Sequence, residues 1–249
     1  MLLFALKYVL WFTHPCLQAL IAGTMLRRKL YREYPIFLVY TVSHVVRFVM
    51  LFWIYHRGNR DAYRYAFLCA EVVDAALAFG TVHELYRGLL RSYSGVQKFA
   101  SIVFRATLIV LLAAAVVSAA TAPAADTSRL LAGVFTLDRA AAVVRGGLLL
   151  LLFLLSCYFG LRWQHFAFGI AAGFALQSSV ALATYALHAH FGLLGKPILS
   201  VISAAAYNCA VFIWLAYLFS PEPVPRPGKL PSRLELDGWN ETLLELLNQ

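Results

Sequence analysis

The sequence has few charged residues, and this scarcity excludes most soluble proteins. Only 13% of its 249 residues are Asp, Glu, Lys or Arg, whereas 61% are hydrophobic and the mean hydropathy is +0.72. Soluble globular domains are about one quarter charged and about half apolar. The composition therefore predicts an all-α, polytopic integral membrane protein.

Other absences reduce the number of functions that the sequence allows. The sequence lacks the HExxH, GxSxG and P-loop motifs, so it predicts no enzyme activity and no catalytic residue. The net charge of +9 does not indicate a nucleic-acid partner, because the basic residues separate apolar runs and do not gather on one soluble surface. Four isolated cysteines predict small buried apolar residues, with neither a disulfide nor a metal site. They are Cys16, Cys69, Cys157 and Cys209.

Seven apolar runs are long enough to cross a membrane, since about 20 helical residues span the hydrocarbon core. They lie at about 2–25, 35–55, 66–90, 99–120, 135–161, 166–188 and 197–219. The segment 121–129 has the composition of a loop. We therefore expect a seven-helix transmembrane domain at 1–220, a proline-rich extended tether at 221–233 and an amphipathic helix at 234–249.

The distribution of Lys and Arg predicts the orientation of the bundle. One side receives eleven of these residues: Arg27, Arg28, Lys29, Arg32, Arg87, Arg91, Lys98, Arg162, Arg226, Lys229 and Arg233. The other side receives six: Arg57, Arg60, Arg64, Arg129, Arg139 and Lys196. This predicts an outside N-terminus and a cytoplasmic C-terminus in a bacterial-type inner (cell) membrane. Such an arrangement resembles the membrane sensing regions of bacterial signalling proteins and, more loosely, rhodopsins and receptors.

Four charged residues are expected deep inside the bundle, where their burial is costly. Counting about 1.5 Å per residue from the cytoplasmic ends places Arg47 at about 18 Å, Asp74 at about 20 Å, Arg145 at about 22 Å and Glu71 at about 24 Å. The simplest pairing joins Arg47 to Asp74, and Glu71, one turn away on the same helix, shares the guanidinium of Arg47. The cluster of these four residues either neutralises itself and fixes helix register, or forms a ligand, ion or proton site.

Other polar residues occur inside the spans. Glu84 and Arg105, at about 5 and 9 Å from the cytoplasmic side, form a second polar cluster with His83. His44, Gln177, Tyr207 and Asn208 are candidates to line a pocket that faces the first cluster. Such groups also bond across helices without any further function.

Two histidines are weak candidates for haem ligands. His14 and His44 lie at about 18 and 13 Å, whereas axial ligation needs facing histidines at matching depth. We therefore predict no cofactor and no metal site, with haem as a minor alternative. Gly169 and Gly173 form a GxxxG pattern that allows close packing within the chain or, less simply, a homo-oligomer.

These observations together predict a receptor-like or accessory membrane protein. It would act by binding a ligand, a lipid of the bilayer or a membrane or cytoplasmic protein partner, through the Arg/Asp/Glu cluster in the outer half of the bundle. The alternative is a membrane transport or redox protein that uses the same charges and histidines.

Overall fold

All secondary structure in the described part of the chain is helical. The computed structural model describes residues 2–58, 60–90, 126–159, 163–191 and 196–221, together with residues 102, 106, 109 and 113. Its helices are α1 (Leu2–Arg27), the short 3-10 helix η1 (Leu30–Arg32), α2 (Pro35–His56), α3 (Arg60–Leu89), α5 (Asp126–Phe159), α6 (His165–Phe191) and α7 (Lys196–Phe219).

Five of these helices are long and apolar enough to cross a membrane, as in a multi-pass membrane protein. They are α2, α3 and α7 together with segments of α5 (Arg139–Tyr158) and α6 (His165–Leu187). Large apolar side chains also lie on their outer surfaces: Val46 is 58% exposed, Leu150 61% and Phe212 53%. An outer surface of this kind would be a liability in water and is typical of a bundle that lipid surrounds.

The helix bounds follow most of the predicted runs, with differences at the ends. α3 begins at Arg60, six residues before the predicted start at 66, and α5 begins at Asp126, nine residues before 135. The predicted loop at 121–129 is thus wrong from Asp126 onwards, because Asp, Thr and Ser also favour helix starts. The tether after Pro221 and the amphipathic helix at 234–249 lie outside the described residues, as does the run at 99–120 apart from four helical positions.

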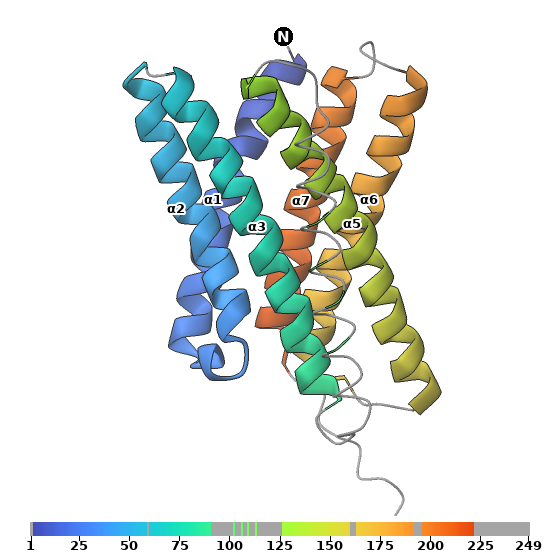
Figure 1. Ribbon diagram of the computed structural model, residues 1–249. Coiled ribbons are helices and arrows are strands. Elements are labelled where there is room, and N and C mark those ends of the chain that lie inside the picture. Colours follow the sequence, from blue (N-terminus) through green and yellow to red (C-terminus); the bar gives the residue numbers. More distant parts are fainter. Residues whose placement is uncertain are drawn as a thin grey trace, which may run out of the picture.

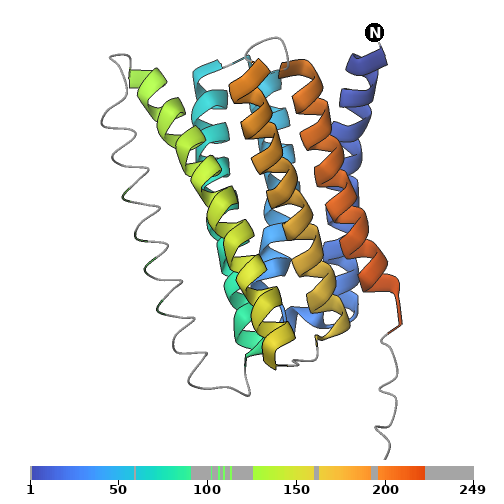
Figure 2. The same cartoon turned by 90° about the vertical axis from the view of Figure 1, so that its right-hand side faces the viewer.

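The six helices form a closed ring. Each one packs against two neighbours, in the order α1, α2, α3, α5, α6, α7 and back to α1. Figures 1 and 2 show this ring from two sides. α1, α3, α5 and α7 begin at one end, which we call the N-terminal end, and α2 and α6 begin at the opposite end. α3 and α5 therefore run in the same direction although they are neighbours.

An aromatic plug fills the interior of the ring toward the opposite end. It consists of Phe37, Tyr40, Phe174 and Trp214, all 0% exposed. The ring centroids of Phe37 and Phe174 both lie 5.1 Å from that of Trp214, and Tyr40 lies 5.2 Å from Phe174. These are the spacings of favourable aromatic pairs. The plug joins α2, α6 and α7 into one core.

Two glycines of α6 allow the plug to form. A Cβ atom on Gly173 would overlap the indole of Trp214, and a Cβ on Gly169 would overlap the ring of Tyr217. The GxxxG pattern therefore serves the packing of α6 against α7 within the chain. Both glycines are buried, so neither is left on the outer surface for the homo-oligomer that the sequence also allowed.

The helix connections use left-handed backbone conformations. Gly58, between α2 and α3, has φ +70°, which glycine adopts without steric cost. Lys29, between α1 and η1, has φ +59°, which costs about 1–2 kcal/mol for a residue with a side chain. Next to it, Arg28 donates from Nη1 to the carbonyl of Leu218, so a cation stabilises the C-terminal end of α7.

The cysteines correct one prediction. Their apolar surroundings predicted that all four would be buried. All four instead lie exposed on the surface of the described bundle. An apolar segment of a membrane helix has one face toward lipid, so hydrophobicity does not distinguish interior from exterior. None of the four forms a disulfide in the part of the chain that the structure describes.

Candidate functional site

A cavity occupies the half of the ring nearer the N-terminal end. Its volume is about 470 Å³, and all six helices contribute side chains to its wall. We call it the central cavity. It adjoins the aromatic plug, because the ring of Tyr40 lies 4.6 Å from that of His44, which lines the cavity. Seven sequence-predicted residues line it: His14, His44, Arg47, Glu71, Asp74, Arg145 and Gln177, with Tyr207 from α7 as an eighth.

The first charged pair in the cavity joins α2 to α3. The guanidinium of Arg47 donates from Nη2 to Oε1 of Glu71. Both side chains are only about one fifth exposed, at 21% and 23%. Arg47 also lies over the ring of Phe67, with its Cζ 5.1 Å from the ring centroid. Arg47 and Glu71 therefore largely neutralise each other at the wall of the cavity.

A second pair lies one helical turn closer to the plug. Nε2 of His44 is 2.7 Å from Oδ1 of Asp74 and 2.6 Å from the hydroxyl of Tyr207. That hydroxyl is in turn 3.0 Å from the hydroxyl of Tyr40. Asp74, His44, Tyr207 and Tyr40 thus form a polar chain from the cavity wall to the plug.

The expected pairing of Arg47 with Asp74 is wrong, whereas the contact of Arg47 with Glu71, which was expected to share it, is present. α2 and α3 are antiparallel neighbours, so a step back along one helix matches a step forward along the other. His44 lies three residues before Arg47, and its partner Asp74 accordingly lies three residues after Glu71. The real register is therefore one turn away from the depth estimate. Counting residues from apolar ends cannot detect this shift, because α3 extends further than its apolar run.

Arg145 of α5 lies in the same cavity but has a different environment. Its Nε donates to Oγ of Ser178 at 2.9 Å, and its Cζ lies 5.6 Å from the ring centroid of Phe174. Among the described residues, no carboxylate oxygen lies within 4.0 Å of its guanidinium nitrogens. Arg145 therefore shares the cavity with Glu71 and Asp74, as expected, without forming an ion pair with either.

Several buried polar atoms of the cavity wall have no hydrogen-bond partner in the described part of the chain. They are both ring nitrogens of His14 and Nε2 of Gln177, while Oδ1 of Asp74 has only its ion contact with His44. A buried polar group without a partner costs about 1–3 kcal/mol. Such groups are normally satisfied by ordered water or by a bound molecule.

The two haem candidates are in direct contact. The rings of His14 and His44 meet edge to face, with centroids 5.4 Å apart, and Tyr207 packs against His14 at 4.3 Å. This arrangement does not fit axial haem ligation, because no gap for a porphyrin separates the rings. Within the residues that the structure describes, no group of three or more His, Cys, Asp or Glu side chains could hold a metal ion.

The remaining candidates lie elsewhere. Asn208 is buried but does not line the central cavity, and its Nδ2 donates to the carbonyl of Ala204 at 2.8 Å. Glu84 accepts the backbone N–H groups of Ile36 and Phe37, both at 3.1 Å, and so caps the start of α2. This is a structural role, since the N–H groups in the first turn of a helix have no helical partners and α2 begins at Pro35.

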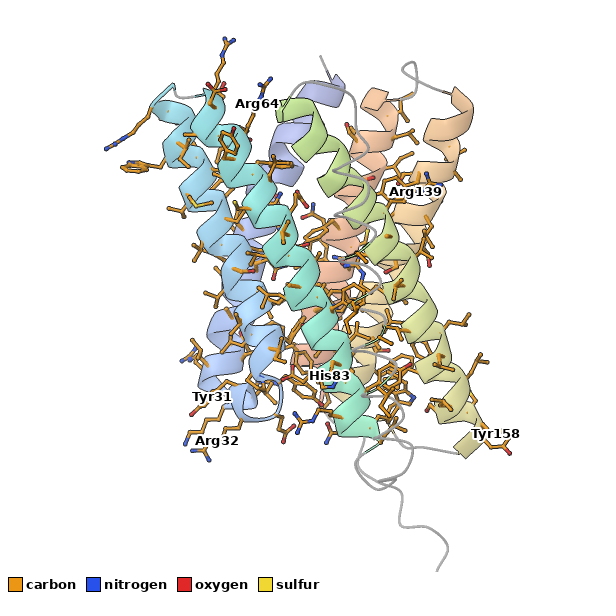
Figure 3. The ribbon with its side chains drawn as sticks, in the orientation of Figure 1. Tyr31, Arg32, Arg64, His83, Arg139 and Tyr158 are labelled. Atoms are coloured by element: carbon orange, nitrogen blue, oxygen red, sulfur yellow. The ribbon has the colours of Figure 1, made fainter. Side chains whose placement is uncertain are left out.

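A second cavity of about 530 Å³ lies beside this cap, at the opposite end of the ring. Its wall includes His83, Glu84, Arg32 and Arg87. Figure 3 shows His83 and Arg32 toward this end, with Arg64 and Arg139 nearer the N-terminal end. Arg105, the expected partner of Glu84, lies outside the described residues.

Sequence reasoning missed one contributor to the polar chain, Tyr40. Tyr40 lies four residues before His44 and seven before Arg47, so helical periodicity places all three on one face of α2. Ser178, a polar residue that the apolar run of α6 shows as plainly as Gln177, accepts from the guanidinium of Arg145. This spacing could have indicated Tyr40, but a tyrosine in an apolar run is usually interpreted as an aromatic residue of the membrane interface.

Comparisons with known proteins add no relative. No protein-family model matches the chain, and neither a curated protein nor a solved structure shows significant similarity to it.

Proposed function

We propose that this chain is a receptor-like multi-pass protein of a cell (inner) membrane that binds a small molecule in the central cavity. One observation carries the proposal: the cavity wall contains buried polar atoms, on His14 and Gln177, that no other described residue satisfies. Its volume of about 470 Å³ lies within the range of about 300–1,000 Å³ that is typical of ligand pockets.

The proposed orientation places this cavity in the outer half of the membrane. Seven crossings would put the N-terminus outside and the C-terminus in the cytoplasm. The parallel course of α3 and α5 supports a crossing between residues 90 and 126, because the chain leaves α3 at one end of the ring and begins α5 at the other. The basic residues Arg27, Arg28 and Lys29 lie at the end that would face the cytoplasm.

A matched pair of substitutions on α6 tests ligand binding. Ala181 lines the central cavity, whereas Ala183, two residues further along, is exposed on the outer surface. Purified protein in lipid nanodiscs should retain a small molecule that native mass spectrometry detects. Ala181→Phe should remove that molecule and Ala183→Phe should not. Equal retention by both variants, or none by the unmodified protein, would contradict the proposal.

The polar chain favours proton-coupled transport as a second candidate. Asp74, His44, Tyr207 and Tyr40 are linked by contacts of 2.6–3.0 Å, which could carry a proton from the cavity toward the plug. Beyond Tyr40 the described interior is aromatic, so binding without transport remains our first proposal. Proteoliposomes with a pH-sensitive dye decide between the two: proton flux that Asp74→Asn abolishes would establish transport.

A further inference from the structure

Donor groups on the α5–α6 side of the central cavity lack acceptors in the described part of the chain. Arg145 uses only its Nε, toward Ser178, and its Nη groups have no carboxylate or carbonyl acceptor among the described residues. Nε2 of Gln177 likewise has no acceptor there. Arg145 from α5 and Gln177 from α6 both line the central cavity, so these two sets of unused donors face the same space.

The acidic residues do not correct this imbalance. Glu71 accepts from Arg47, and Asp74 lies against His44, on the α2–α3 side of the cavity. A guanidinium remains charged at any accessible pH, and its planar donors match the two oxygens of a carboxylate. The α5–α6 side therefore has unused donors that an anion with two acceptor oxygens would satisfy.

The rest of the wall limits the body of such a ligand. Phe48, Leu51 and Phe67 on one side and Val180 on the other present apolar side chains to the same space. Apolar walls with a few converging polar groups favour an amphipathic small molecule over a fully polar one.

We infer that the central cavity binds a small amphipathic carboxylate, with the carboxylate held by Arg145 and Gln177 and the apolar body against the α2–α3 wall. The inference rests on the proposed binding function and assigns its ligand class. Arg47 has a different role, because Glu71 already neutralises it.

Three probes of similar size, two of them isosteric, test the charge requirement on the unmodified protein. Phenylacetate, phenylacetamide and phenethylamine share one aromatic body and carry a negative, a neutral and a positive group. In nanodiscs of neutral lipid, phenylacetate should bind about tenfold or more tightly than the other two, because hydrogen bonds to a charged group are the stronger ones. Calorimetry and the shift in unfolding temperature both report the binding.

Two substitutions on α5 test the anchor. Arg145→Gln should weaken phenylacetate binding by about tenfold or more, while Arg139→Gln, at an exposed position on the same helix, should leave it unchanged. A second arm uses palmitate mixed into the nanodisc lipid, which distinguishes a membrane fatty acid from a water-soluble acid. Binding in either arm that Arg145→Gln abolishes supports the inference.

The contrary outcomes separate the two proposals. If phenylacetamide or phenethylamine binds as tightly as phenylacetate and Ala181→Phe blocks that binding, the binding function stands and the carboxylate is wrong. If Arg145→Gln binds phenylacetate normally, the anchor is wrong. If no probe and no fatty acid binds the unmodified protein, both proposals fail. The three-probe comparison needs no variant, so a folding defect in Arg145→Gln would not obscure it.

Discussion

Replacing Gly173 by alanine should destabilise the bundle at a defined contact. The new Cβ atom would lie 2.7 Å from Cε2 and 2.8 Å from Cδ1 of Trp214, well inside the optimal carbon–carbon distance of about 3.5–4.0 Å. Trp214 cannot retreat toward lipid, since it is 0% exposed and packs between Phe37 and Phe174. Its Nε1 also donates to the carbonyl of Ile170 at 3.2 Å, and a displaced indole would lose that bond.

These terms set the expected magnitude. Overpacking a filled core costs about 1–3 kcal/mol, and the lost hydrogen bond costs a further 0.5–1.5 kcal/mol or so. The better helix propensity of alanine offsets up to about 1 kcal/mol of this destabilisation. We expect Gly173→Ala to lower the free energy of unfolding by about 2 kcal/mol.

Unfolding with sodium dodecyl sulfate in mixed micelles, followed by far-ultraviolet circular dichroism, measures this change without relying on Trp214 fluorescence. Gly147→Ala on α5 is the matched control, because a Cβ atom there meets no neighbour within 4 Å. It should change stability by less than about 1 kcal/mol and in the favourable direction. If Gly173→Ala behaves like Gly147→Ala, the described approach of α6 to α7 is refuted. Trp214→Phe should partly rescue Gly173→Ala, since the smaller ring frees the space that the methyl group needs.

Substitutions at three other sites test further features of the fold by the same unfolding assay. Glu84→Ala should cost about 1–2 kcal/mol because it removes the cap of α2, whereas Ala at the exposed Glu33 should have little effect; equal effects would contradict the capping role. Arg47→Leu and Glu71→Leu should each destabilise by about 2 kcal/mol, and the double variant should be more stable than the sum of the two predicts; strict additivity would argue against the pair. Lys29→Gly should raise stability by roughly 0.5–1 kcal/mol by relieving the left-handed backbone, and a matching gain from Lys29→Ala would show that no strain exists there.

Hydrophobic runs predicted the helices well and their contacts less well. Six runs coincide with the described helices, because about 20 apolar residues leave a chain few alternatives in a membrane. The start of α5 at Asp126 was missed, since polar residues beyond the hydrocarbon core carry no hydropathy signal. The same limitation hid the orientation of Cys16 and its counterparts, whose segments are apolar on every face.

The members of the central cavity were easier to predict than their partners. Charges and amides within apolar runs are conspicuous, so Arg47, Glu71, Asp74 and Arg145 were found from the sequence. Which of them touch depends on helix rotation and on a register shift of one turn, and neither quantity is visible in a single sequence. The contact between His44 and Asp74 arises from that register alone.

The central cavity and the plug follow from side-chain volume along the same helix faces. On α6, the face that carries Phe174 in the plug carries Gln177 and Ala181 one and two turns further on, and on α7 the face of Trp214 continues to Ser203. Large rings therefore fill the ring of helices at one end, and small or polar residues leave it hollow at the other. If the hollow were only a packing defect, apolar residues would line it, because unsatisfied polar atoms add cost without adding contacts. The arginine, histidine and amide groups concentrated at this level are those that the amphipathic carboxylate we propose would satisfy.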